Sequence, residues 1–283
     1  MEYAVLNNGL KMPLMGIGTA QIDTADQCEQ YVQRAIAAGY RLIDTAAAYQ
    51  NEEAVGRAIK ASGIQRNELF LTTKLWIQDS GYKETKQAFD RSKKRLGVDY
   101  IDLYLIHQPI GDIYGSWRAM EELYEAGEIK AIGVSNFSSD RLADLMLFHK
   151  VKPAINQIEV HPYCQANEIH QYMQAVNVQT EAWGVFAGGK SCLLKNDELV
   201  RLGKKYKKTA AQVILRWMLQ RRIVSVFKAV SMEHLKKNID ILDFELTDKE
   251  LLQMMHFDTR QSIFINYNLP ETVQRLGMTR FAI

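Results

Sequence analysis

The segment RLIDTAAAYQNEEAVGRAIKASGIQRNELFLTTKLW (residues 41–76) contains one complete repeat of the pattern that decides the fold. It begins with a short apolar run, continues with a stretch whose apolar residues recur at helical spacing, and closes with a second apolar run, 69–76. Gly63 follows the helical stretch, where a helix usually stops. This order predicts a strand, a helix and a second strand parallel to the first.

The same alternation continues on both sides of this segment. Eight apolar runs are interpreted as strands: LMGIGT (14–19), RLIDTA (41–46), LFLTTKLW (69–76), IDLYLIH (101–107), AIGVSNF (131–137), AINQIEVH (154–161), VQTEAW (178–183) and IVSVFK (223–228). Amphipathic stretches separate them, and several end at a glycine, such as Gly39, Gly97 or Gly127. Eight strand-then-helix units in 283 residues predict a (β/α)8 TIM barrel, in which the active site forms at the carboxyl ends of the strands.

The two ends of the chain depart from this alternation. YAVLNNGLKMP (3–13) predicts an N-terminal β-hairpin with Asn8-Gly9 in its turn. Near the other end, TDKELLQMM (247–255) predicts a further helix, and residues 262–283 have no strand period. We interpret the latter as a C-terminal tail over one mouth of the barrel, and we expect residues 1–283 to form a single barrel domain.

A doubly wound sheet gives the same alternation and is the main alternative fold. A dinucleotide-binding sheet of that kind opens with GxGxxG between its first strand and helix. Here Gly16 and Gly18 are followed by Gln21 where the third glycine belongs. The motif fails, which favours the barrel.

Composition excludes several classes of protein. With 47% hydrophobic and 24% charged residues, the chain has enough apolar residues for a compact core. Its net charge of +2 favours neither nucleic acid nor an anionic membrane as a partner. The amino terminus lacks the features of a signal peptide, so we expect a cytoplasmic protein. We also expect a monomer. The three cysteines are too few and too scattered for a disulfide framework or a zinc site, and we expect no metal.

Four polar residues stand at or just past the ends of predicted strands. They are Asp44, Tyr49, Lys74 and His107. Each one alone has an ordinary structural explanation, such as a strand-end cap, a loop aromatic, a solvated strand terminus or a satisfied core imidazole. Because strand ends of a barrel converge on one mouth, the four together predict a catalytic site.

At this point the chain resembles the aldo-keto reductases, in the style of bacterial members with short loops, over nearly its whole length. The resemblance lies in ordered motifs that include GLKMPLMGIGTA (9–20), LTTKLW (71–76), IDLYLIHQP (101–109) and INQIEVHPY (155–163). It implies a reductase that transfers a hydride from a nicotinamide coenzyme to a small aldehyde, ketone or dicarbonyl compound.

The four residues make chemical sense in this reaction. Reduction of a carbonyl develops negative charge on its oxygen, so a proton donor is required, and Tyr49 can supply the proton. Its ordinary pKa of about 10 is high for an acid at neutral pH, and we expect the ammonium of Lys74 to lower it. Asp44 is expected to hold Lys74 in a partly buried pair. Neutral His107 is expected to donate a hydrogen bond to the carbonyl.

The resemblance also implies a coenzyme site. Ser135, Asn136 and Gln157 are expected to bind the nicotinamide carboxamide, and Trp183 to stack on the ring. The full set of predicted coenzyme contacts is Thr19, Asp44, Ser135, Asn136, Gln157, Trp183, Gly184, Val185, Phe186, Phe227, Lys228, Ala229, Ser231, His234, Lys237 and Asn238.

This chain departs from the family's pattern along the coenzyme path. Residues 184–186 read Gly-Val-Phe instead of Ser-Pro-Leu, and 226–229 read Val-Phe-Lys-Ala instead of Ile-Pro-Lys-Ser. His234 stands where many NADPH-using members have arginine, and Lys237 replaces a common glutamate. A neutral imidazole cannot grip a phosphate as guanidinium does, although Lys228 and Lys237 can supply point charges. We expect NADP(H), with NAD(H) as a competitor.

The substrate pocket is expected beside His107 and Trp76. Ala20 and Gln108 occupy positions where family members often have aromatic residues, which predicts a wide and polar pocket, although Phe186, Phe227 and Tyr267 could refill it. Two alternatives stay open at this point. One is a nicotinamide-nucleotide-binding barrel that acts as a sensor with little turnover, and the other is oxidation of an alcohol as the physiological direction.

Overall fold

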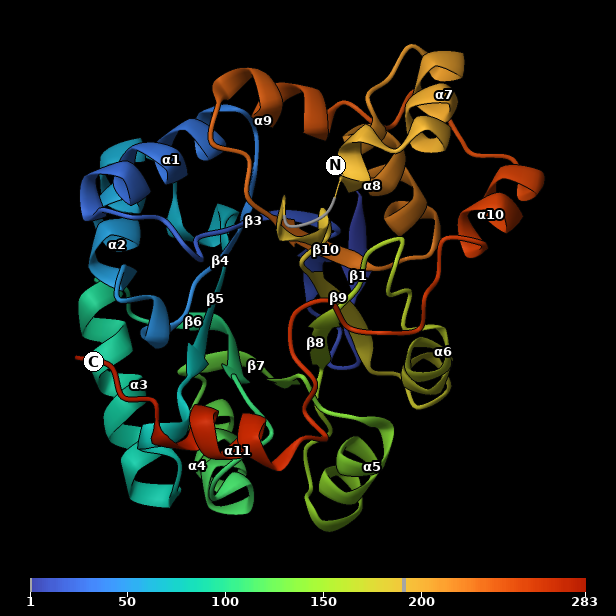
Figure 1. Cartoon of the computed structure of the whole chain (residues 1–283). Helices are drawn as coiled ribbons and strands as arrows, with labels where there is room; N and C mark the ends of the chain where they lie inside the picture. Colours follow the sequence, from blue (N-terminus) through green and yellow to red (C-terminus); the bar gives the residue numbers. More distant parts are fainter. Residues whose placement is uncertain (1, 190–191) are drawn as a thin grey trace.

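The computed structural model describes residues 2–189 and 192–283, and its centre is a closed barrel of parallel strands (Figure 1). The barrel strands are β3 (Met15–Gly18), β4 (Leu42–Asp44), β5 (Phe70–Leu75), β6 (Ile101–Ile106), β7 (Ile129–Ser135), β8 (Ile155–Glu159), β9 (Gln179–Trp183) and β10 (Val224–Phe227). They follow chain order around the barrel, and β10 pairs with β3 to close it. The predicted TIM barrel is confirmed, and every predicted apolar run overlaps one of its strands, although β7 begins two residues before the run predicted at 131–137.

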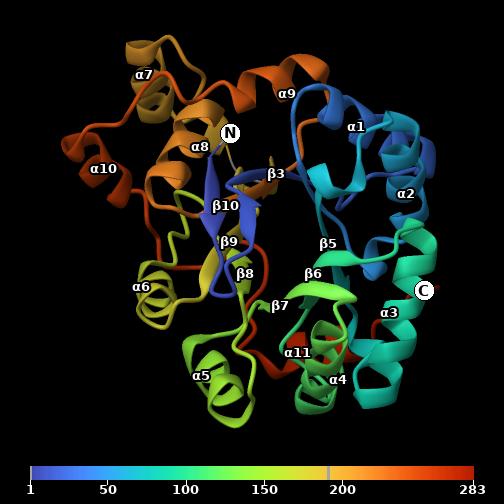
Figure 2. The same ribbon diagram turned by 180° about the vertical axis from the view of Figure 1, so that it is seen from behind.

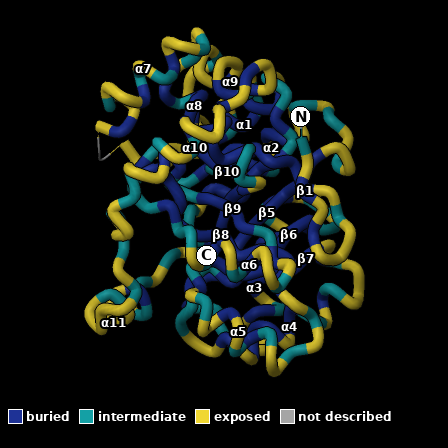
Figure 3. Tube along the Cα trace, turned by 90° about the vertical axis from the view of Figure 1, so that its right-hand side faces the viewer, coloured by how far each residue is buried: buried dark blue, intermediate teal, exposed yellow. Residues whose placement is uncertain are grey.

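Helices surround the barrel on its outer side (Figure 1). They are α1 (Ala25–Ala37), α2 (Glu52–Ser62), α3 (Tyr82–Leu96), α4 (Ile113–Glu125), α5 (Ser139–Phe148), α6 (Asn167–Ala175), α7 (Asp197–Tyr206), α8 (Ala210–Gln220), α9 (Met232–Ile239), α10 (Asp248–Met255) and α11 (Pro270–Met278). The side chain of Thr24 caps the start of α1, and Gly97 ends α3 in the left-handed conformation. Figure 3 shows the buried residues concentrated in the strands and on the inner faces of the helices.

The interior of the barrel is closely packed, which fixes the positions of the strand ends. Gly16 and Gly133 both face inward at crowded points. A Cβ on Gly16 would lie 2.3 Å from Cγ of Leu42, and one on Gly133 would lie 2.7 Å from Cδ2 of Leu105. Glycine is therefore required at both positions by the close approach of neighbouring strands.

The chain ends cover opposite mouths of the barrel. The predicted hairpin forms from β1 (Tyr3–Val5) and β2 (Lys11–Pro13) and lies across the amino-terminal mouth (Figure 2). Its turn side chains, Asn7 and Asn8, donate to the backbone oxygens of Pro153 and Lys130, both 2.9 Å away. The segment after α10 crosses the carboxyl-terminal mouth (Figure 1).

This C-terminal segment contains α11, a helix that the sequence did not predict. The reason is its length: α11 spans nine residues, which is shorter than the window of about 11 to 18 residues in which a helical period can be recognised. Among the described residues, none of the helices is both long and apolar enough to cross a membrane.

Candidate active site

The four residues predicted as catalytic lie together at the carboxyl-terminal mouth. Asp44 is the last residue of β4, Lys74 lies one residue before the end of β5, and His107 follows β6. Tyr49 ends a short 3-10 helix, Ala47–Tyr49, that comes soon after β4. Because β4, β5 and β6 are neighbours in the barrel, their ends bring these side chains to one place.

Lys74 and Asp44 form an ion pair inside the barrel. Nζ of Lys74 lies 2.5 Å from Oδ1 of Asp44 and 3.0 Å from the backbone oxygen of Thr45. The two side chains are 0% and 4% exposed, so the pair is more deeply buried than the sequence led us to expect. Burial disfavours the ammonium, but the charge of Asp44 and its hydrogen bond outweigh burial and raise the pKa of Lys74. Lys74 is therefore a cation at neutral pH.

The phenol of Tyr49 lies beside this pair. Nζ of Lys74 is 5.2 Å from the centre of the Tyr49 ring. Burial raises the pKa of Tyr49, whereas the charge and hydrogen bond of Lys74 lower it, and the net direction is upward. Lys74 thus acts in the expected sense, but burial has the larger effect. At neutral pH the phenol keeps its proton, as a proton donor must.

His107 is held as a neutral imidazole. Burial, and then the nearby charge of Lys74, lower its pKa well below the ordinary value. Its ring meets the rings of Tyr49 and Trp76 edge-on, with centres 5.6 and 5.2 Å apart. Its Nδ1 is buried and has no hydrogen-bond partner among the described residues. The neutral state is the one that the sequence predicted for a hydrogen-bond donor.

The predicted nicotinamide-binding side chains form a network that leads to Asp44. Nε2 of Gln157 donates to Oδ2 of Asp44 over 2.9 Å, and Oγ of Ser135 donates to the backbone oxygen of Gln157 over 2.8 Å. Asn136 donates to the backbone oxygen of His107 over 3.1 Å and accepts from Nε1 of Trp183 over 2.9 Å. Four of the predicted coenzyme residues are therefore brought together beside the catalytic pair.

The predicted coenzyme residues beyond Trp183 fall into two groups, and the first group is buried. Val185, Phe227, Ala229 and Asn238 are buried, so their side chains belong to the core and their backbone is what a ligand can reach. Phe186 packs on Phe227 with ring centres 5.4 Å apart. Gly184, which replaces the family's serine, has a left-handed backbone with φ of 69° and lies under the ring of Phe264.

The second group lies before and along α9 and is exposed. Ser231 caps this helix by accepting from the backbone N–H of His234 over 3.1 Å. Lys228 donates to a backbone oxygen in the loop after β3 over 2.8 Å, and Lys237 pairs with Glu233 over 2.6 Å. These exposed cations and the helix start together suit a phosphate group.

Thr19 is buried in a network that the sequence did not reveal. Its hydroxyl donates to Oγ1 of Thr45 over 2.9 Å, and Nδ2 of Asn51 donates to the backbone oxygen of Thr19 over 2.9 Å. Thr45 also donates to Oδ1 of Asn51 over 2.9 Å. Because Asn51 lies two residues after Tyr49, this network fixes the loop that presents the phenol.

The C-terminal segment covers the predicted substrate residues. Nε1 of Trp76 donates to the backbone oxygen of Thr279 over 3.1 Å, and the ring of Phe281 meets Trp76 edge-on with centres 5.2 Å apart. Trp76 is 5% and Gln108 6% exposed, whereas Ala20 is partly exposed. The tail thus covers Trp76, while the position of Ala20 stays partly open.

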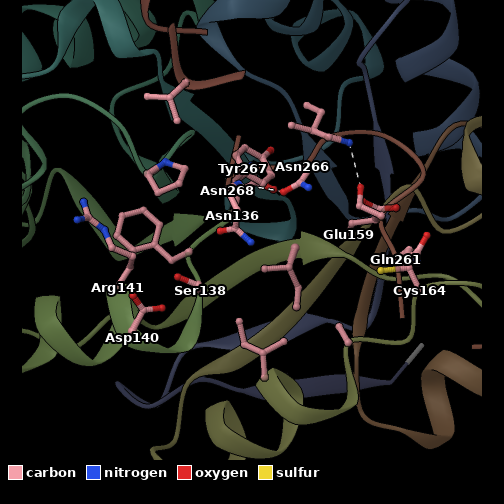
Figure 4. Close-up of a pocket in the computed structure, with 18 of the residues that line it drawn as sticks. Asn136, Ser138, Asp140, Arg141, Glu159, Cys164, Gln261, Asn266, Tyr267 and Asn268 are labelled. Carbon is pink, nitrogen blue, oxygen red and sulfur yellow. Dashed lines mark hydrogen bonds between the residues drawn. The ribbon is translucent and has the colours of Figure 1, made fainter. Parts of the chain in front are cut away.

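An open cleft of about 1040 Å³ adjoins this centre (Figure 4). It lies between the start of α5 and the C-terminal segment, and Asn136 and Tyr267 both line it. Asn136 also contacts His107, which connects the cleft to the catalytic residues. Glu159 fixes one wall of the cleft, because its carboxylate accepts from the backbone N–H of Ile263 over 3.1 Å and from the hydroxyl of Ser262.

A nicotinamide coenzyme fits the residues at this mouth. Ser135, Asn136 and Gln157 supply the hydroxyl and amide groups that match a carboxamide, and a Cβ on Gly18 would meet nothing within 4 Å, so there is open space at the end of β3. This mouth of the TIM barrel holds a buried lysine–carboxylate pair, a tyrosine and a neutral histidine. Together these groups define an oxidoreductase that moves a hydride and a proton.

The comparisons with known proteins agree with this class. The model of the aldo/keto reductase family matches residues 14–258, and the chain belongs to this family. It is 44% identical over 247 residues to glyoxal reductase of Bacillus subtilis, covering 87% of this chain and 89% of that protein.

Two solved structures are also similar. MGS-M4, an aldo-keto reductase from a Medee basin deep-sea metagenome library, superposes with a TM-score of 0.91 at 41% identity, covering 94% of this chain and 98% of that one. An aldo-keto reductase of Bombyx mori in complex with NADP superposes with a TM-score of 0.88 at 33% identity, covering 94% and 95%.

Proposed function

We propose that this protein reduces small aldehydes, ketones or dicarbonyl compounds to alcohols with NADPH, and that Tyr49 donates the proton. The observation that carries the proposal is the buried Asp44–Lys74 pair beside a protonated tyrosine and a neutral histidine. The coenzyme supplies the hydride when it is bound.

Each residue of the chain has a separate task in this proposal. Tyr49 donates its proton to the oxygen as negative charge develops there, and the cation of Lys74 stabilises the phenolate that remains. Asp44 orients Lys74 through the 2.5 Å contact. His107 donates a hydrogen bond to the same oxygen and so fixes the face of the carbonyl. Positioning of this kind contributes to the rate separately from proton transfer.

A spectrophotometric screen tests the proposal. Aldehydes, α-ketoaldehydes, ketosteroids and keto sugars are offered with each reduced coenzyme, and loss of absorbance of the reduced nicotinamide is followed. We expect turnover of small α-ketoaldehydes first, in keeping with the similarity to a glyoxal reductase. Stoichiometric coenzyme binding without turnover of any carbonyl compound would instead favour the sensor alternative, which leaves the catalytic residues without a use.

The exposed groups at the start of α9 support NADPH over NADH. Ser231 caps the helix start and Lys228 precedes it, while Lys237 lies in the last turn. Arg34 reaches the backbone oxygen of Val230 over 3.4 Å, so cationic groups gather near the helix start, where an additional phosphate could lie. The absence of an arginine at 234 weakens this preference. NADH turnover equal to or better than NADPH turnover would overturn the choice of coenzyme and leave the carbonyl chemistry in place.

Replacing His234 by arginine is expected to tighten NADPH binding by about 1 kcal/mol or more, which is about fivefold in Kd, because guanidinium makes a charge-assisted contact with phosphate. NADH, which lacks that phosphate, should bind as before. The measurement is quenching of tryptophan fluorescence by each coenzyme. His256→Arg adds the same charge at the exposed end of α10 and serves as the control. An unchanged Kd in His234→Arg would mean that α9 lies away from the nucleotide.

A further inference from the structure

Glu181 is a buried carboxyl group inside the barrel that the proposed reaction does not yet use. It lies on β9, is 0% exposed, and stands opposite Gln157 of β8 and Val224 of β10. Both of its carboxyl oxygens are buried and make no hydrogen bond of good geometry with another described residue. An unpaired buried carboxylate is costly, so this group needs an explanation.

The surroundings of Glu181 connect it to the catalytic pair. Gln157 is the residue of β8 that pairs in register with Glu181, and its amide donates to Asp44 over 2.9 Å. Gln157 therefore stands between the two carboxyl groups, Asp44 and Glu181. Lys74 is the cation close to both of them.

Burial and the neighbouring charges decide whether Glu181 is protonated or ionised. Burial and then the charge of Asp44 raise the pKa of Glu181 to about 8, against the opposing effects of Gln157 and Lys74. At pH 7 Glu181 is thus mainly protonated, and the Asp44–Lys74 pair has no net charge beside it. Above pH 8 the same space holds two carboxylates and one ammonium.

Ionisation of Glu181 acts directly on the proton donor. A negative charge on Glu181 raises the pKa of Tyr49 and of Lys74. A phenol with a higher pKa is a weaker acid for protonating the carbonyl oxygen. The titratable groups facing Glu181 are Asp44 of β4, Lys74 of β5 and Tyr49, while Gln157 and Val224 on the adjacent strands do not titrate.

We propose that Glu181 is a positioning residue of the catalytic centre, which stands beside Gln157, the residue that donates to Asp44, and whose ionisation weakens Tyr49 as a proton donor. This inference rests on the proposed roles of Asp44, Lys74 and Tyr49. A residue that only filled the barrel would be apolar, as Val224 and Leu105 are.

The first test is the pH profile of kcat/KM for carbonyl reduction, in the unchanged protein and in Glu181→Gln. The unchanged protein should lose activity as the pH rises through about 8, because Glu181 ionises there. Glutamine keeps the shape but cannot ionise, so any remaining fall should lie at least about one pH unit higher. Superimposable profiles would overturn the proposal.

The second test is stability against pH, which needs neither coenzyme nor activity. The pKa of Glu181 is about 8 in the folded protein and about 4.3 in the unfolded chain. Its contribution to stability is therefore complete below pH 4.3 and is lost as the pH rises through 8. The thermal midpoint of Glu181→Gln relative to the unchanged protein should rise steadily between pH 5 and 8.5.

Controls keep the outcomes distinct. Glu52 is another buried glutamate, outside the barrel, and its carboxylate accepts from Thr73 and Arg95 over 2.6 and 3.2 Å. Glu52→Gln should therefore alter stability without moving the pH profile of turnover.

If Glu181→Gln does not fold, Glu181→Met tests the same loss of ionisation. A pH-independent stability difference would refute the inference. An unchanged protein that reduces no carbonyl compound would refute the proposed function instead, while the stability test would still decide the state of Glu181.

Discussion

Replacing Tyr49 by phenylalanine is expected to lower kcat for carbonyl reduction by about 10² to 10⁴, the range that general acid catalysis usually contributes. The phenylalanine ring keeps the shape of the site, while the proton that must reach the carbonyl oxygen is removed. Lys74 keeps its contacts with Asp44 and Thr45, so the buried pair should survive the change. The Kd for coenzyme should stay within about twofold, since the predicted carboxamide contacts come from other residues.

The measurement combines stopped-flow reduction of an α-ketoaldehyde with coenzyme titration. Tyr104→Phe is a matched control, because Tyr104 is buried on the outer side of β6 and its hydroxyl has no hydrogen-bond partner among the described residues. That control should leave both turnover and coenzyme affinity as they are. Near-normal turnover in Tyr49→Phe would remove Tyr49 from its proposed role.

The barrel could be predicted because its signal is repeated along the whole chain. Each strand of β3 to β10 overlaps an apolar run that the sequence showed, and glycine stops such as Gly63 and Gly97 mark helix ends in the structure. Local periodicity was sufficient here because parallel strands that are covered by helices must be apolar. The helix α11 was missed because its nine residues are too few to establish a period.

The catalytic residues could also be located, but the degree to which they are buried could not. Strand-end positions and the family motifs predicted the group of Asp44, Lys74, Tyr49 and His107. The surroundings of the site come from distant parts of the chain: Gln157 contacts Asp44 from 113 residues away, and the tail meets Trp76 from 203 residues away. Contacts of that range leave no periodic trace in a sequence.

Glu181 shows why an interior polar residue is hard to predict. In VQTEAW a single acidic residue among alternating neighbours is typical of a strand with one solvated face. The closure of β10 onto β3 turns this face into the interior, where the same carboxyl group lies near Asp44. The possible signal was its position two residues before Trp183, on the face of the strand that Trp183 also occupies.

Replacing Lys74 by methionine is expected to lower the free energy of unfolding by about 3 to 5 kcal/mol, the usual cost of leaving one member of a buried ion pair without its partner. Asp44 would keep its buried charge with the amide of Gln157 as its remaining side-chain donor. Asp44→Asn should be costly for the same reason, because it strands the ammonium. The measurement is urea-induced unfolding followed by circular dichroism.

The double variant Lys74→Met with Asp44→Asn distinguishes the structural role of the pair from its chemical role. With no charge left to strand, it should be more stable than the sum of the single losses predicts, whereas additive losses would show that the two residues are not coupled. Lys237→Met, in the exposed pair with Glu233, should have little effect on stability and is the control.

Turnover should remain low in the double variant even where stability returns, because Tyr49 would still lack the cation that stabilises its phenolate. Recovery of both properties together would mean that the pair supports the barrel and does not take part in proton transfer.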